Sequence, residues 1–197
     1  GETVVTHPRV FVTVGRGSRA TLIESHVSLD NSPSFSNAVV EISLLENASL
    51  EHHKLHHAKP NGFFIGKSWI CQSVSSEYHS NLIQAGSRLT RDEVVVRLNG
   101  SHASCSLTGL SLAQNDEQVD TQTMIHHAVP HCSSKQNYKS ILNDDAIGVF
   151  NGIVRAFPNA IGTNATQHSR NLLLSANATA NVKPQLEIET DEIHCSH

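Results

Sequence analysis

The sequence predicts an all-β fold, in which a stacked solenoid is favoured over a β-sandwich. Three observations support this prediction. Short segments alternate hydrophobic and polar residues with a period of two, a turn-and-strand pattern recurs along the chain, and only 5% of the 197 residues are aromatic. A core built mainly from Val, Ile, Leu and Ala suits regular layers better than packing around large rings.

The alternation is clearest in three segments, each of which predicts a short, half-buried strand. The alternating residues are Val10, Val12 and Val14, then Val40, Ile42 and Leu44, then Val94, Val96 and Leu98. No stretch keeps the i, i+3, i+4, i+7 spacing of an amphipathic helix for long. The nearest candidate for a helix is the segment at residues 133–143.

The recurring pattern combines a turn residue, a small residue and a strand. It occurs in the segments GSRATLIES, ENASLEHHK, GSHASCSLT and ANATANVKP. One rung of a stacked solenoid needs this combination, because its turns are tight and its backbones crowd together. The irregular spacing leaves an ordinary β-sandwich open. No linker interrupts the chain, so we expect a single domain over residues 1–197, as part of a longer protein.

Charge and cysteine content argue against several functions. The formal net charge of −4 argues against a nucleic-acid partner, because phosphate contacts need clustered Lys and Arg. No apolar run approaches the roughly 18 residues that a membrane span requires. Cys71, Cys105, Cys132 and Cys195 form no C-x-x-C pair, so zinc knuckles and ferredoxin-type motifs are not supported. A reducing compartment is the better interpretation of this cysteine usage.

Histidine is unusually frequent, with fourteen residues, and four of them fall in the segment LEHHKLHHA. If this segment is a strand, His52, Lys54 and His56 share one face, while His53 and His57 share the other. A lysine between two histidines repels a cation. We therefore expect a solvated surface here rather than a metal site.

The other polar clusters support neither a complete metal site nor an enzyme. The segment HHAVPHC, residues 126–132, lacks a second set of ligands, and Pro130 favours a turn or a strand edge. We expect structural or surface roles for it. No G-x-S-x-G, H-E-x-x-H or P-loop motif occurs. The acidic pairs are adjacent in sequence and would point to opposite faces of a strand, so they are poor acid–base partners.

The last residues, EIETDEIHCSH, place a thiol and an imidazole two residues apart. The parity of the hydrophobic residues changes near Asp191, which predicts a bend or bulge there. After it, Cys195 and His197 share one strand face, with their side chains about 6–7 Å apart. Such a pair can ligate one soft or borderline metal, but the remaining ligands must come from elsewhere. A structural Cys beside an exposed His is the alternative.

Several long segments resemble the SufB/SufD family of iron–sulfur cluster assembly proteins. They are NAVVEISLLENASLEHHKL, GSRLTRDEVVVRLNGSHASCSLTGL, HHAVPHCSSKQNYKSIL, GVFNGIVR and TQHSRNLLLSANATANVKPQLEIETDEIHCSH. The resemblance runs from about Pro8 to His197 and is closer to the SufD branch, because residues 172–174 are leucines where the SufB branch usually has a cysteine. The segment NAIGTNATQ departs from the family, whose members read something like AQKTDARQ.

The resemblance implies a right-handed parallel β-helix core, flanked by N- and C-terminal helical regions that lie outside these 197 residues. It implies a scaffold subunit rather than an enzyme. The β-helix would pair with a SufB-like subunit, and the C-terminal helical region would bind a SufC-like ATPase. His197 would contribute to a transient Fe–S cluster shared with the SufB-like partner, and Cys195 stands beside it. The implied compartment is the bacterial cytoplasm or the plastid stroma.

Two alternatives stay open. A homodimeric structural β-helix whose cluster site has decayed is favoured by the departures in NAIGTNATQ. A carbohydrate-active β-helix enzyme would need clustered Asp residues on successive rungs, and the sequence offers none.

Overall fold

A computed structural model describes residues 3–28 and 32–196, and every regular element within them is a β-strand. The strands are β1 (Val4–Thr6), β2 (Arg9–Val14), β3 (Arg19–Val27), β4 (Ser34–Leu44), β5 (Ser49–His57), β6 (Gly62–Gln72), β7 (Glu77–Ala85), β8 (Leu89–Leu98), β9 (Ser104–Ala113), β10 (Gln118–His127), β11 (Ser133–Leu142), β12 (Ile147–Ala156), β13 (Thr163–Leu173), β14 (Thr179–Ile188) and β15 (Ile193–Ser196).

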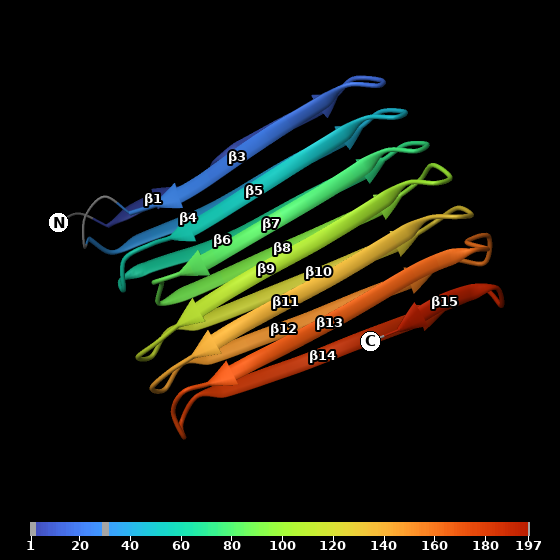
Figure 1. Cartoon of the computed structure of the whole chain (residues 1–197). Coiled ribbons are helices and arrows are strands. Elements are labelled where there is room, and N and C mark those ends of the chain that lie inside the picture. Colours follow the sequence, from blue (N-terminus) through green and yellow to red (C-terminus); the bar gives the residue numbers. More distant parts are fainter. Residues whose placement is uncertain (1–2, 29–31, 197) are drawn as a thin grey trace.

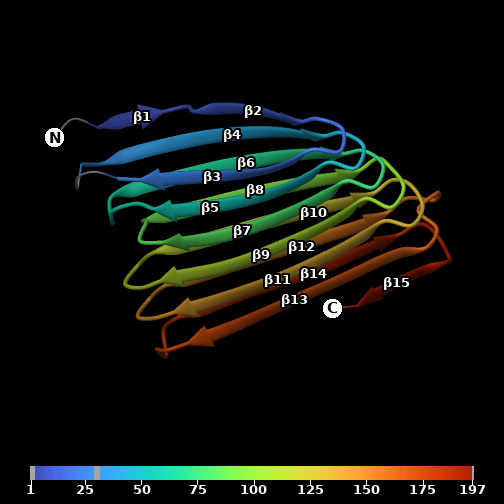
Figure 2. The same ribbon diagram turned by 45° about the horizontal axis from the view of Figure 1, so that its top comes forward.

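The strands form two facing parallel sheets, and from β2 onward the chain passes alternately from one sheet to the other (Figures 1 and 2). The larger sheet has the order β1-β4-β6-β8-β10-β12-β14, and β2 also pairs with β4; the smaller has the order β15-β13-β11-β9-β7-β5-β3. Because neighbours within a sheet are alternate strands in sequence, each pair of strands makes one coil of a solenoid. The predicted parallel β-helix is therefore confirmed, and the β-sandwich is wrong.

The coils differ in length although their strands stay in register. Phe63 pairs with Leu89, 26 residues later, whereas Ile147 pairs with Thr179, 32 residues later. The three strands predicted from hydrophobic alternation lie within β2, β4 and β8. The irregular repeat in the sequence thus reflects variable connections between regular strands.

The predicted helix at residues 133–143 is wrong. This segment is β11, which pairs with β9 on one side and β13 on the other. Its inward-facing residues alternate as a strand requires, but several of them are polar: Ser134, Gln136, Tyr138, Ser140 and Leu142. Because most of its interior residues are polar, this strand does not show the alternation of hydrophobic and polar residues by which the other strands were predicted.

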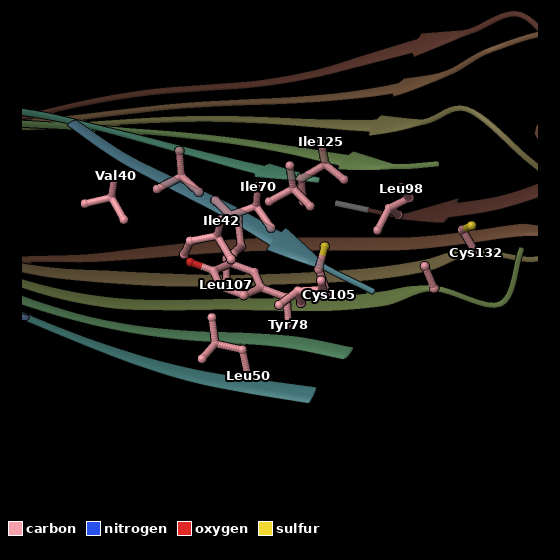
Figure 3. Packing of buried hydrophobic residues seen from close by; sticks show 14 of the residues in the cluster. Val40, Ile42, Leu50, Ile70, Tyr78, Leu98, Cys105, Leu107, Ile125 and Cys132 are labelled. Atoms are coloured by element: carbon pink, nitrogen blue, oxygen red, sulfur yellow. The ribbon is translucent and has the colours of Figure 1, made fainter. Parts of the chain in front are cut away.

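The core lies between the two sheets, where like positions of successive coils stack (Figure 3). On the larger sheet, Ile42 pairs with Ile70, Ile70 with Val96, and Val96 with Ile125, and all four are at most 1% exposed. Leu50 faces them from the smaller sheet. Burial of each such side chain stabilises the fold by about 1.5–3 kcal/mol.

The corner that leads from the larger sheet to the smaller one uses left-handed backbone. Four residues have positive φ angles between 53° and 62° there: Asn47, Ser75, His102 and His131. The N–H of Asn47 donates to the carbonyl of Val74 at 3.0 Å, so hydrogen bonding between coils continues around the corner. The rings of His102 and His131 stack, with centroids 5.3 Å apart.

This close stacking gives the first prediction. Gly100→Ala should destabilise the fold by about 1–3 kcal/mol, because the added Cβ would overlap the backbone nitrogen of Val74 in the preceding coil. Gly15→Ala is the matched control, since the nearest atom to its added Cβ is Ser18 Oγ at 3.6 Å. Urea unfolding followed by circular dichroism measures both variants. Equal free energies of unfolding would contradict the packing described for this corner.

Candidate functional site

The candidate site at the C-terminal end of the stack is built on β15. The chain leaves β14 at Ile188, bends at Asp191 and Glu192, and enters the smaller sheet beside β13. The predicted bend near Asp191 is confirmed, and it is the corner between the two sheets. The parity of the hydrophobic residues changes there because the inward direction reverses from one sheet to the other.

Cys195 lies on the inward-facing side of this last coil. It pairs in register with Ala165, which is 1% exposed and faces the interior. Cys195 itself is half-buried, because no described strand lies beyond β15. Burial raises the pKa of its thiol, and hydrogen bonding with the Ala165 backbone opposes that shift. Metal binding here would therefore have to displace a proton.

His197, the other predicted ligand, lies outside the described residues, so its position stays a prediction. Its neighbours His194 and Ser196 are both exposed. Of the predicted pair, the described part of the chain thus provides one thiol. Within that same part, no three or more His, Cys, Asp or Glu side chains lie close enough to hold a metal ion.

The last coil presents an apolar surface to solvent. Val182 is 40% exposed and Ile188 48%, whereas the residues beneath them in register, Phe150 and Ala156, are only 6% and 1% exposed. Three leucines at the end of β13 add to this surface, with exposed fractions of 46–59%: Leu172, Leu173 and Leu174. An apolar surface beside unpaired strand edges is suited to covering by another polypeptide.

A buried polar cluster occupies the opposite, N-terminal end of the stack. The predicted face is confirmed, since His52, Lys54 and His56 point the same way, but their predicted solvation is wrong: none is more than 3% exposed. Lys54 Nζ donates to Asp92 Oδ2 at 2.6 Å. The alternation of the segment identified a common face, but gave no sign that this face turns inward.

The charges in this cluster are balanced by partners distant in sequence. Nε2 of His52 lies 3.0 Å from Glu24 Oε2, and that of His26 lies 2.5 Å from Glu24 Oε1. Burial acts to raise the pKa of Glu24, but the hydrogen bonds of His26 and His52 and the charge of Lys54 outweigh it, so the pKa lies well below its usual value. A positive ammonium at the centre of the cluster disfavours a bound cation.

His56 stands apart within the cluster. Burial lowers its pKa to about 4, with Asp92 opposing, so the ring is neutral at pH 7. Neither ring nitrogen has a hydrogen-bond partner among the described residues. The ring packs on Phe64, with centroids 4.1 Å apart, and borders a cavity of about 640 Å³ between β1, β3 and β4. The strands β1, β3 and β4 lie at the opposite end of the stack from β15 (Figure 1).

The second histidine segment has the structural role expected for it. His127 is fully buried, with its Nε2 2.9 Å from Ser134 Oγ, and burial lowers its pKa to about 4. His126 is only partly buried and packs edge-on against Phe157, while His131 forms the corner. All four cysteines are free, and none of them forms a disulfide.

Comparisons with known proteins relate this fold and end surface to one family. The sequence model described as "SUF system FeS cluster assembly, SufBD core domain" matches residues 1–197. Iron-sulfur cluster assembly protein SufD of Escherichia coli is 32% identical over 198 residues, which cover 100% of this chain and 47% of that protein. Protein ABCI7, chloroplastic, of Arabidopsis thaliana is 33% identical over 195 residues, covering 98% of this chain and 41% of that protein.

A third relative is the iron-sulfur cluster assembly SufBD family protein slr0076 of Synechocystis, which is 30% identical over 202 residues, 98% of this chain and 45% of that protein. The chain thus spans less than half the length of these curated relatives. Within residues 3–28 and 32–196, no helix is long and apolar enough to cross a membrane.

The buried ion pair gives the second prediction. Lys54→Met should lower the free energy of unfolding by about 3–5 kcal/mol, because it leaves the Asp92 carboxylate buried without its partner. The double variant Lys54→Met/Asp92→Leu should recover most of this loss. Lys67→Met is the control, because Lys67 is 47% exposed beside Glu93 and should cost at most about 1 kcal/mol. Urea unfolding measures all three, and equal effects of Lys54→Met and Lys67→Met would contradict the burial.

The buried imidazoles give the third prediction. The pKa values of His56 and His127 fall from an ordinary 6.5 to about 4, so the unfolded chain binds protons in this range that the folded chain does not. The free energy of unfolding should therefore decrease as pH falls from 6.5 to 4, by about 3 kcal/mol for each ring. The lowered pKa of Glu24 adds a further loss only below its ordinary 4.5.

Urea unfolding at several pH values between 7 and 4 measures this slope. His127→Leu should make it shallower, whereas His53→Gln, at an exposed position of β5, should leave it unchanged. A slope that persists in full in His127→Leu would show that folding does not lower the pKa of this ring.

Proposed function

The chain belongs to the SufBD core-domain family of the SUF iron–sulfur cluster assembly system, and from this premise we propose that it is the β-helix core of a SufD-like scaffold subunit. In this role it pairs with a SufB-like subunit and supports the building and transfer of Fe–S clusters. The observation that carries the proposal is the exposed last coil, on which Cys195 faces an interior that no further described coil covers.

The partner subunit covers this end of the stack. Val182, Ile188 and the three leucines at the end of β13 offer it an apolar surface, and β14 and β15 offer strand edges that no other described strand pairs with. When two β-helices meet in this way, they bury apolar surface that is exposed to water in each separate subunit. This burial is the main driving force for their association. The shared surface also brings the partner's side chains next to Cys195.

The cluster is cargo, and this chain holds only part of it. Cys195 and His197 supply two ligands, while Fe–S clusters are held mainly by four thiolates, with imidazole as an alternative ligand. The remaining ligands therefore come from the SufB-like partner. An incomplete ligand set on each subunit favours release, because separating the subunits removes half of the ligands. His197 binds iron only when neutral, and Cys195 only as the thiolate.

The chain itself needs no catalytic group for this role. Energy enters through a SufC-like ATPase, which binds a helical region outside these 197 residues. The bacterial and chloroplastic relatives favour the bacterial cytoplasm or the plastid stroma as the compartment. The alternative, a homodimeric β-helix with a decayed site, uses the same apolar end surface with a second copy of the chain and needs no cluster.

The fourth prediction separates these two functions. The full-length protein is coexpressed with its SufB-like partner and the ATPase, and the iron, sulfide and visible absorbance of the purified complex are measured. His197→Ala should lower the cluster content about tenfold or more, since it removes a direct ligand. His194→Ala is the matched control, because it alters an exposed histidine three residues earlier in the sequence and should leave the cluster content unchanged.

Cys195→Ala, in the same experiment, tests the role of the thiol and should also lower the cluster content. Equal cluster contents in His197→Ala, Cys195→Ala and the wild type would support the decayed homodimer.

A further inference from the structure

We propose that Gln167 is a positioning residue for the cluster at the last coil, where its side-chain amide hydrogen-bonds the sulfur atoms held next to Cys195. This inference rests on the proposed function and adds to it a residue that the ligand pair does not include. It follows from three features of Gln167: its burial, its lack of partners and its place on β13 one residue past the stretch that pairs with β15.

Gln167 is buried without a partner for either polar atom of its amide. It is 2% exposed, and neither Nε2 nor Oε1 forms a hydrogen bond within the described part of the chain. A buried amide in this state costs free energy that an apolar side chain of the same size would avoid. Its presence on an otherwise regular strand therefore points to a group that it contacts in the working complex.

Interior amides further down the stack are better satisfied. Gln84 donates to Ser111 Oγ at 2.7 Å and to Thr121 Oγ1 at 2.8 Å. Gln136, the register partner of Gln167 one coil below, accepts from Thr123 Oγ1 at 2.6 Å. Of these three amides, only the one adjacent to the last coil has no partner at all.

The packing around Gln167 gives its amide no polar partner across the interior, and the Nε2 of Gln136 in the coil below is itself unpaired in the described part of the chain. Across the interior the amide lies against Gly152 of β12, where an added Cβ would overlap its Nε2 and come within 2.9 Å of its Cδ. Above Gly152, in register on β14, lies Pro184, whose ring offers no donor or acceptor. Among the described residues of the last coil, the inward-facing polar group nearest to Gln167 is the thiol of Cys195, on β15.

The register places Cys195 within reach of this amide. Cys195 pairs with Ala165, and Gln167 follows two residues later on the same inward face of β13. Neighbouring strands are about 4.8 Å apart and two residues span about 6.6 Å, so the two Cα atoms are about 8 Å apart. A glutamine side chain and a bridging sulfide on the iron that Cys195 ligates can together span this separation.

The chemistry of the amide suits the cluster. Its Nε2–H groups can donate to a thiolate or a bridging sulfide. Such hydrogen bonds, from residues that do not bind iron themselves, orient the ligands and adjust the reduction potential of the cluster. Because the amide is neutral, it does this without adding charge to the interior. Gln167 thus hydrogen-bonds the sulfur atoms of the cluster, while Cys195 and the partner's ligands bind its iron atoms.

The test uses the full-length protein in complex with its SufB-like partner and the ATPase. Gln167→Leu removes the hydrogen bonds at similar volume, and Gln136→Leu is the matched control in the same interior column, one coil further from the site. Thermal unfolding reports stability. The visible circular dichroism of the assembled cluster and the half-time of its loss to an iron chelator report positioning, which a merely structural role would not change.

Gln167→Leu should unfold at or above the wild-type temperature, show an altered visible dichroism spectrum, and lose its cluster about tenfold faster. Gln136→Leu should match the wild type in both cluster measurements. If the branched leucine does not fit beside Gly152, Gln167→Met removes the same hydrogen bonds with an unbranched chain.

A Gln167 variant that folds and keeps the wild-type spectrum and half-time would overturn this inference alone. A wild-type complex that assembles no cluster would overturn the proposed function, and the role of Gln167 with it.

Discussion

The in-register parallel pairing of each strand with the strand one coil away is the constraint on which this structure depends. It satisfies the backbone of every inner coil from both sides, and it places each interior side chain directly on the equivalent one of the coil before. A column such as Ile42, Ile70, Val96 and Ile125 is the apolar result. The same in-register pairing places Cys195 next to Ala165, so that the thiol points toward the interior of the β-helix.

The constraint also explains how so many polar residues fit inside. Interior positions are fixed by parity, so a polar side chain at such a position cannot turn away and must find a partner on an adjoining coil or across the interior. Lys54 and Asp92 form such a pair at one end of the stack, and Thr123 and Gln136 form another near the middle. Gln167 is a polar interior position just past Thr166, where the described pairing of β13 with β15 ends, so its paired neighbour in the described part of the chain is on β11.

The sequence revealed the strands with hydrophobic alternation, the solenoid and the bend before the last strand, because these depend on local patterns and turn residues. It did not reveal β11, whose inward residues are largely polar. It also did not reveal the burial of His52 and His56, which depends on Glu24 and Asp92 from other coils. Resemblance to a family supplied the parallel β-helix and the candidate ligands. Gln167 gave no signal in sequence, since only the packing of three strands reveals an amide without a partner.

The unequal coil lengths have an evolutionary consequence. Coils of 26 and 32 residues stack equally well because most of the extra residues lie in the connections at the two edges, while the strands keep their pairing. Insertions and deletions can therefore accumulate along these edges without shifting any interior column. The edges are where related chains are free to diverge in length and acquire appendages, while the sheets keep a common frame.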